Sequence, residues 1–167
     1  MKVGVAMRRI GDRIIIEEEG GMATLKQILA GKAGPVSVVS PDDSVVAAIG
    51  LMAAKNMGSV LVMDGETLVG ILSERDLVLK LLATGKVPKE VKVSEIMTSH
   101  PYCANVSQSV ESCITLMSER RFRHLPVIDE GKKVLGVVSM GDLVKSIISE
   151  QAFMLDQFER YVYSGSL

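Results

Sequence analysis

Apolar residues follow the same succession of spacings twice along this chain. A short apolar stretch comes first, then apolar residues at helical spacing, then two apolar runs joined by a polar turn. A further helical stretch follows each pair of runs. The predicted elements are 36–39, 45–53, 59–73 and 75–82 in the first copy, and 102–106, 110–117, 124–139 and 142 onward in the second. The pattern therefore predicts a strand–helix–hairpin–helix unit written twice.

Polar residues mark where the first helix of each copy begins. In the first copy Ser40 is followed by Pro41, which suits the first turn of a helix, and then by the acidic Asp43. In the second copy Asn105 has Gln108 three residues later. We therefore predict helix N-caps at Ser40 and Asn105.

The two copies are in register with each other. Asp76 and Asp142 lie 66 positions apart, whereas Met52 and Met117, upstream of the hairpin turn, lie 65 apart. The extra residue of the second copy therefore falls in its turn, at 129–133, and turns are where insertions are tolerated. This agreement indicates an internal duplication.

Each copy is small for a domain, at about 50–60 residues, and would be marginal alone. Its hairpin strands are almost continuously apolar, which suits sheets that are covered on both faces. We therefore expect the two units to pack on each other. The predicted parts are an N-terminal extension 1–21, a first unit 22–85, a linker 86–93, a second unit 94–150 and a helical tail 151–167.

Composition narrows the class of protein. Hydrophobic residues make up 47% of the 167 residues and aromatic residues only 4%, so the core must be aliphatic. The formal net charge of −1 argues against broad binding to nucleic acid or to membrane surfaces. No apolar run approaches the ~20 residues of a membrane span.

Cysteine usage and the N-terminus bear on the compartment. Cys103 and Cys113 set no disulfide framework, so we expect both to be buried, reduced thiols in a cytoplasmic protein. A mitochondrial presequence is the alternative, favoured by arginines near the N-terminus and opposed by the acidic run at 17–19.

The motif Ser-x-x-Asp closes each hairpin, as Ser73 to Asp76 and as Ser139 to Asp142. One interpretation is a helix capping box, in which the serine and the acidic residue satisfy each other's backbone N–H groups. The other is a ligand site, because a carboxylate offers two acceptors to a ribose diol and the helix N-terminus favours a phosphate. The residues alone leave both open.

The duplicated pattern resembles the CBS domain, whose tandem pairs are called Bateman modules. The resemblance covers about residues 23–149. The C-terminal tail also resembles that of small stand-alone CBS-pair proteins, which end in a helix. The resemblance to the CBS domain rests on Gly-apolar-apolar-Ser-x-x-Asp occurring twice, on "RHLPVID" at 123–129 and on "EIMTSHP" at 95–101. It implies an α+β fold of two tandem CBS domains, each β-α-β-β-α, packed through their sheets in a pseudo-two-fold arrangement.

The same resemblance implies a function. It indicates a non-catalytic regulatory module that binds an adenine nucleotide (AMP, ADP, ATP or NAD) between the domains, needs no metal and acts through a partner protein. The residues implied to bind the nucleotide are Val38, Gly58, Ser59, Ser73, Arg75, Asp76, Thr98, His100, Pro101, Tyr102, Arg121, Arg123, His124, Pro126, Ser139 and Asp142. The preferred nucleotide, the regulated partner and the dimer geometry stay open.

The basic residues before the second hairpin predict unequal sites. Arg123 and His124 match phosphate-contacting positions of the family, whereas their counterparts Gly58 and Ser59 are uncharged. We expect one tight and one weak site, with Asp142 contributing more to binding than Asp76.

Several of these residues have a structural alternative. His124 can serve as a structural histidine, His100 as a turn residue and Arg75 as an exposed helix residue. For Arg120 we favour a solvated face at the end of a helix.

Beyond the second unit a loose helical stripe continues into the tail. Its members are Leu143, Ile147, Met154, Phe158 and Val162. The tail can pack back on its own domain or form a dimer contact; we favour a homodimer because aromatic residues gather there. The rival functions are a structural dimeric adaptor with empty clefts and an enzyme. No nucleophile or base with an orienting partner supports the enzyme.

Overall fold

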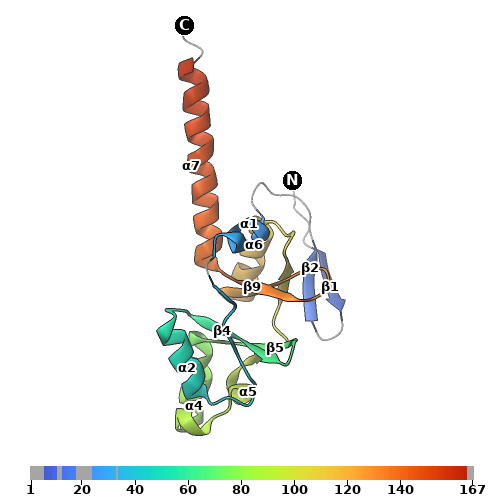
Figure 1. Cartoon of the computed structure of the whole chain (residues 1–167), viewed down its shortest axis with the longest axis vertical. Helices are drawn as coiled ribbons and strands as arrows, with labels where there is room; N and C mark the ends of the chain where they lie inside the picture. Colours follow the sequence, from blue (N-terminus) through green and yellow to red (C-terminus); the bar gives the residue numbers. More distant parts are fainter. Residues whose placement is uncertain (1–5, 11–12, 18–23, 33, 165–167) are drawn as a thin grey trace.

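The protein consists of two packed α+β domains and one long projecting helix (Figure 1). The computed structural model describes residues 6–10, 13–17, 24–32 and 34–164. The first sheet has the order β3-β4-β5-β6, with β3 (Val38–Val39), β4 (Ser59–Asp64), β5 (Thr67–Ser73) and β6 (Thr98–Ser99). The second has the order β1-β2-β7-β8-β9, with β1 (Ala6–Ile10), β2 (Arg13–Glu17), β7 (Cys103–Asn105), β8 (His124–Ile128) and β9 (Val134–Ser139).

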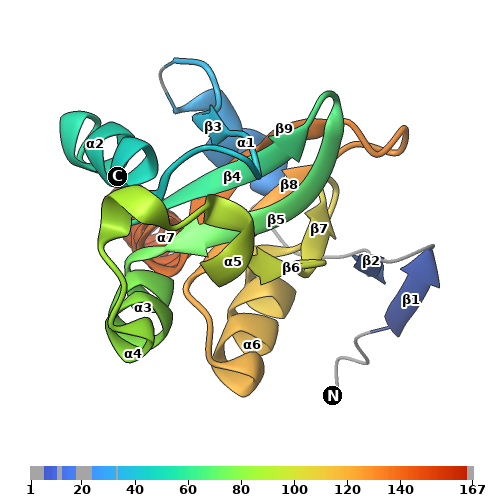
Figure 2. The same ribbon diagram turned by 90° about the horizontal axis from the view of Figure 1, so that it is seen from below.

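Helices lie on the outer face of each sheet, below the first and above the second in Figure 1, and Figure 2 looks from below onto the helices of the first domain. The first domain carries α2 (Val45–Ala54), α5 (Val93–Ile96) and a helical run made of α3 (Glu74–Asp76), a π-helical stretch (Leu77–Leu81) and α4 (Leu82–Thr84). A 3-10 turn (Pro88–Glu90) precedes α5. The second domain carries α1 (Leu25–Ala30), α6 (Val110–Arg120) and α7 (Met140–Ser164).

Both predicted hairpins are present, and their registers are equivalent. Ser59 pairs with Ser73 in the first, and His124 pairs with Ser139 in the second. In each domain a short strand runs parallel to the first hairpin strand, as β3 beside β4 and β7 beside β8. The Asp-Gly turn holds Gly65 at φ 56°, a left-handed conformation that glycine adopts without strain. The duplication inferred from the sequence is thus confirmed in three dimensions.

The predicted N-caps at Ser40 and Asn105 are wrong by the same four residues. The observed caps are Ser44, which accepts from the backbone N–H of Ala47 at 3.2 Å, and Ser109, which accepts from that of Ser112 at 3.2 Å. The earlier polar residues form a preceding turn, in which Asp43 accepts from the N–H of Ser40. The same residue types favour turns and helix N-caps, so the sequence alone did not distinguish the turn from the start of the helix.

A shared core lies where the two sheets face each other. Leu61 and Ile71 of the first domain pack there with Cys103 and Ile128 of the second. The other face of each sheet packs against its own helices. Both hairpins are therefore buried on both faces, which explains their continuous apolar pattern.

The leading segment of each repeat packs on the other domain. Leu25 of α1 is fully buried in the core of the second domain, whereas Val91, Val93 and Ile96 are buried in the core of the first. The linker predicted at 86–93 therefore ends inside the first core. The chain crosses between the domains twice in this way, and each crossing borders a cleft.

The N-terminal region contributes a β-hairpin that extends the second sheet. Strand β2 runs parallel to β7, with Ile15 opposite Cys103 and Ile16 opposite Ala104. The rest of the extension predicted at 1–21 lies outside the described residues.

Helix α7 projects from the body of the molecule (Figure 1). Its first turns pack on the second domain through Met140, Leu143 and Ile147. Every residue from Gln151 to Arg160 is exposed. Among the described helices, this one included, none combines the length and apolar character that crossing a bilayer requires.

Candidate functional site

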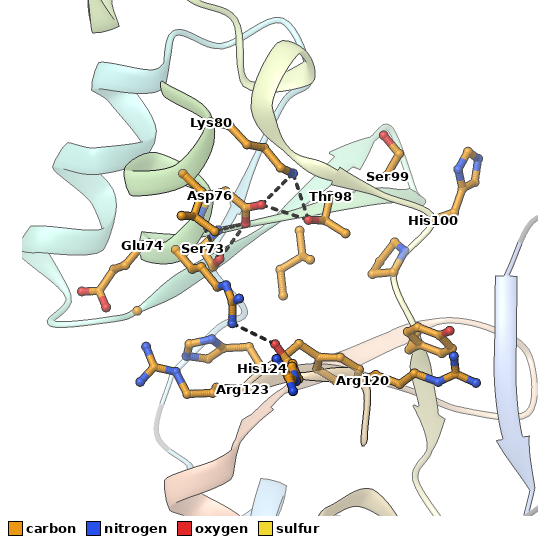
Figure 3. Close-up of a pocket in the computed structure, with 18 residues that line it drawn as sticks. Ser73, Glu74, Asp76, Lys80, Thr98, Ser99, His100, Arg120, Arg123 and His124 are labelled. Atoms are coloured by element: carbon orange, nitrogen blue, oxygen red, sulfur yellow. Dashed lines mark hydrogen bonds and ion pairs between the residues drawn. The ribbon is translucent and has the colours of Figure 1, made fainter. Parts of the chain in front are cut away.

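A cavity of about 490 Å³, here called the first cleft, lies between the two domains (Figure 3). Its lining comes from the β5–α3 junction, from the segment around β6 and from the turn between α6 and β8. Eleven of the predicted site residues line it: Gly58, Ser73, Arg75, Asp76, Thr98, His100, Pro101, Tyr102, Arg121, Arg123 and His124. The other five do not: Val38, Ser59, Pro126, Ser139 and Asp142.

Asp76 is buried at the start of α3 and uses its two oxygens differently. Oδ2 accepts from the backbone N–H of Ser73 at 2.9 Å and from its hydroxyl at 2.6 Å, while the N–H of Asp76 donates to Ser73 Oγ at 3.4 Å. Oδ1 accepts from Thr98 Oγ1 at 3.0 Å and lies 2.7 Å from Lys80 Nζ. The motif is therefore a capping box, and it leaves one carboxylate oxygen on the side of Thr98 and Lys80.

The electrostatics keep this carboxylate ionised. Partial burial acts to raise the pKa of Asp76, but hydrogen bonds from Lys80, Ser73 and Thr98 outweigh burial and hold that pKa below its usual 3.8. Asp76 is therefore an acceptor at neutral pH.

The first cleft carries an excess of positive charge. Its cationic side chains are Arg75, Lys80, Arg120, Arg121 and Arg123, and its acidic ones are Glu74 and Asp76. Arg75 Nη1 spans the domains and donates to the backbone carbonyl of Arg121 at 3.1 Å (Figure 3). An anion in this cleft would meet guanidinium groups from both domains, and guanidinium is well shaped for phosphate.

His124 is half-buried beside Gly58. A Cβ placed on Gly58 would lie 3.1 Å from two atoms of the imidazole ring, so the glycine lets the two domains approach each other here. Burial first, and then the neighbouring Arg123, lower the pKa of His124 below its usual 6.5. The imidazole is therefore neutral at pH 7, and the positive charge predicted for this cluster comes from its arginines.

An aromatic pair forms one wall of the cleft. The rings of Tyr102 and Phe122 stack with centroids 5.7 Å apart and planes 10° apart, and the Arg120 guanidinium lies 5.7 Å from the Tyr102 centroid. Arg120 is thus at the cleft and not only on the solvated face that we favoured. His100 has a φ of 52°, the left-handed region found in turns.

The cleft also contains residues that the sequence analysis did not select. They are Ile71, Glu74, Leu79, Lys80, Ser99 and Phe122, besides Arg120. Lys80 stands four residues after Asp76, and this spacing on a helix was a signal that could have found it. Phe122 lies inside the basic run of 120–124 and was missed because we considered only the charges.

A second cavity, of about 630 Å³, is here called the second cleft. Its lining residues are Leu29, Lys32, Gly34, Pro35, Val36, Ser37, Lys55, Met57, Leu135, Gly136 and Val137. Ser37, Lys55 and Met57 are the counterparts, 65 positions earlier, of Tyr102, Arg120 and Phe122 in the first cleft. The two clefts are therefore related by the duplication.

Asp142 forms the same capping box in the second repeat. Its Oδ2 accepts from the N–H of Ser139 at 2.6 Å and from the hydroxyl at 2.7 Å. The arginine cluster, however, lies in the first cleft with Asp76. The expectation that Asp142 contributes more to binding assumed that the basic cluster lies beside it, whereas the structure places the cluster beside Asp76.

Comparison with known proteins identifies the family. The CBS domain matches residues 25–83 and 93–149, so the chain belongs to the CBS-domain family. Its structure is similar to the crystal structure of the CBS-domain protein NE2398, with a TM-score of 0.72 and 46% identity over 76% of this chain and 99% of that one. The predicted fold of two tandem CBS domains packed through their sheets is thus confirmed.

Two plant proteins are also similar. The chain is 33% identical over 129 residues to the mitochondrial CBS domain-containing protein CBSX3 of Arabidopsis thaliana, covering 74% of this chain and 62% of that protein. The chain thus spans less than two thirds of this relative. Its structure also resembles CBSX2 of the same plant in complex with AMP, with a TM-score of 0.64 and 29% identity over 77% of this chain and 98% of that one.

Proposed function

We propose that this protein is a non-catalytic regulatory module that binds an adenine nucleotide in the first cleft. The observation that carries the proposal is the pairing of an ionised carboxylate, Asp76, with an excess of positive side chains in one interdomain cavity. The carboxylate suits a ribose diol and the guanidinium groups suit a phosphate. The AMP complex of CBSX2 supports the ligand class.

Each group of the first cleft has a role in this proposal. Asp76 Oδ1 accepts from the ribose hydroxyls in exchange for its present bond with Thr98 Oγ1. Lys80, already 2.7 Å from that oxygen, stays close enough to neutralise the carboxylate. Arg75 leaves the carbonyl of Arg121 to contact phosphate, which links nucleotide binding to the contact between the domains.

Titration calorimetry with AMP, ADP, ATP and NAD tests the proposal. We expect saturable binding of at least one of them, with unchanged nucleotide recovered afterwards. Absence of binding by all four would favour the structural adaptor, and a chemically altered nucleotide would favour an enzyme.

A structural adaptor is the second candidate function, because polar groups of the first cleft already bond to other groups of the protein. Lys80 pairs with Asp76, and Arg75 bonds the Arg121 carbonyl. An empty cleft closed by these contacts would hold the two domains together without a ligand.

We further propose that α7 pairs with α7 of a second copy. Val144, Ile148, Gln151, Leu155 and Phe158 follow each other at spacings of 4, 3, 4 and 3, the heptad pattern of a helical seam. Ile148, Leu155 and Phe158 are 61%, 65% and 67% exposed. Gln151 lies at the middle of the seam, where it would meet its own copy in either direction of pairing. A helix that projects into water without tertiary contacts is only marginally stable. Pairing with the same helix of a second copy would bury its apolar side chains.

A further inference from the structure

The second cleft is lined by a lysine, Lys32, whose counterpart Met97 does not line the first cleft. Lys32 and Met97 are counterparts, 65 positions apart, at the point where the chain crosses from one domain to the other. Met97 points its Sδ toward the first hairpin, where a Cβ on Gly70 would lie 2.5 Å from it. Lys32 instead lines the second cleft.

The Lys32 ammonium is held by two groups of the second hairpin and its following helix. Nζ lies 2.7 Å from Asp142 Oδ2 and donates to the backbone carbonyl of Val137 at 2.8 Å. Burial acts to raise the pKa of Asp142, but the hydrogen bonds from Lys32 and Ser139 outweigh it and lower that pKa. The ion pair is only partly exposed, with 38% of the Lys32 side chain and 28% of that of Asp142 accessible.

This ion pair differs from that of Lys80 with Asp76. Lys80 stands one turn after Asp76 on the same helical run and contacts the oxygen that does not cap the helix. Lys32 comes from the opposite segment of chain and contacts Oδ2, the oxygen that also caps α7. Lys32 lines the second cleft and Asp142 does not, so a ribose that approached Asp142 from this cleft would first have to displace Lys32 from Asp142 Oδ2 and from the carbonyl of Val137.

The second cleft has few cationic groups that could compensate for the Lys32–Asp142 ion pair that such a ligand would break. The counterparts of Arg75, Arg121 and Arg123 are Gly141, Asn56 and Gly58. Lys55, the counterpart of Arg120, donates to Ser37 Oγ at 2.9 Å. A phosphate would thus find few free cations there to compensate for the lost ion pair.

We infer that Lys32 closes the second cleft by standing between this cleft and the carboxylate of Asp142, so that each chain holds one nucleotide. This inference rests on the proposed function, because it concerns which of two equivalent clefts is open. Lys32 would then determine how many nucleotides each chain binds, without contacting the nucleotide in the first cleft.

The substitution Lys32→Met installs the residue found at the equivalent position of the second repeat, Met97. Calorimetry with ATP should give one site per chain in the parent and two in Lys32→Met. Lys32→Arg, which keeps a cation, should stay at one. Lys145→Met is the control, because Lys145 is exposed on α7 and lines neither cleft. Circular dichroism of each variant confirms that it is folded.

A second pair of variants isolates the second cleft. Asp76→Ala should bind ATP roughly 10- to 150-fold more weakly in the first cleft. Adding Lys32→Met to Asp76→Ala should give one further site per chain, and adding Asp142→Ala as well should weaken that site. A parent with two sites, or a Lys32→Met variant with no more sites than its parent, overturns the inference. A parent that binds none while Lys32→Met binds one would support the closure of the second cleft by Lys32, but would contradict both one nucleotide per parent chain and the first cleft as the nucleotide site.

Discussion

The carboxylates of Asp76 and Asp142 each cap a helix, and that of Asp76 also lines the first cleft. In both, one oxygen accepts from the N–H and hydroxyl of a serine three residues earlier. The sequence presented helix capping and ligand binding as alternatives. The geometry makes capping compatible with binding at Asp76, because a carboxylate has two oxygens and capping takes one.

The protonation of His124 leads to a prediction about stability. Its pKa is lowered in the folded chain by burial and by Arg123, so the unfolded chain binds more protons just below pH 6.5. The stability that depends on neutral His124 is therefore present above that pH and is lost as the pH falls below it. The lowered pKa values of Asp76 and Asp142 act only below about 3.8.

Urea unfolding at pH 7.5 and 5.5 measures this effect. We expect the parent to lose more stability on acidification than His124→Gln, which has no imidazole to protonate. Equal losses in the two proteins would show that His124 does not couple folding to pH in this range.

The arginines of the first cleft lead to a prediction about affinity. Arg121→Asn with Arg123→Gly installs the residues of the first repeat, and asparagine tolerates the left-handed conformation of position 121. Charge-assisted hydrogen bonds contribute about 1.5–3 kcal/mol each, so ATP affinity should fall at least ~10-fold and depend less on salt.

The matched control removes the same charge elsewhere. Lys132→Asn with Lys133→Gly acts in the exposed turn of the second hairpin, where Lys132 is also left-handed, with a φ of 66°. This control should bind ATP like the parent. Equal effects of the two pairs in calorimetry would mean that only the overall charge matters.

At the scale of elements, the hairpins were predictable and the helix starts were not. Near-continuous apolar runs around Asp64-Gly65 leave few alternatives to a hairpin. The serines that cap α2 and α6, Ser44 and Ser109, are preceded four residues earlier by equally suitable caps. Only the packing of the following helix on its sheet decides between them.

Helix α7 leads to a prediction about self-association. Phe158→Glu places a charge in the proposed seam and should dissociate the dimer, as should truncation after Glu150. Phe153→Glu is the control: Phe153 is 64% exposed, much like Phe158 at 67%, but lies outside the heptad positions. Light scattering over a range of concentrations gives the mass of each variant. If Phe153→Glu dissociates the protein and Phe158→Glu does not, the seam is assigned to the wrong face.

At the scale of the whole molecule, the two repeats exchange their leading segments. Leu25 completes the second core, and Val93 and Ile96 complete the first. A sequence pattern could predict that the repeats pack together, because each sheet needs cover on both faces. It could not predict the exchange, or that the arginines of the second repeat would lie beside Asp76 of the first, because these depend on how the chain crosses between domains.

The position of the first cleft between the domains leads to a prediction about stability. A ligand that binds only the folded chain stabilises it by about 2.7 kcal/mol when its concentration is 100 times Kd. For a chain of this size that corresponds to a rise in Tm of roughly 5–10 °C. Differential scanning calorimetry with and without ATP should show the full rise in the parent and a clearly smaller rise in Asp76→Ala. A rise of equal size in both would place the ligand elsewhere.

The most direct test of the account compares the two aspartates by calorimetry. Asp76→Ala and Asp142→Ala remove equivalent capping boxes, so each controls for the loss of stability caused by the other. We expect Asp76→Ala to weaken ATP binding by about 1.5–3 kcal/mol and Asp142→Ala to leave the affinity of the first cleft unchanged. An ATP affinity that Asp76→Ala leaves unchanged, or that Asp142→Ala weakens as much, would contradict the first cleft as the nucleotide site.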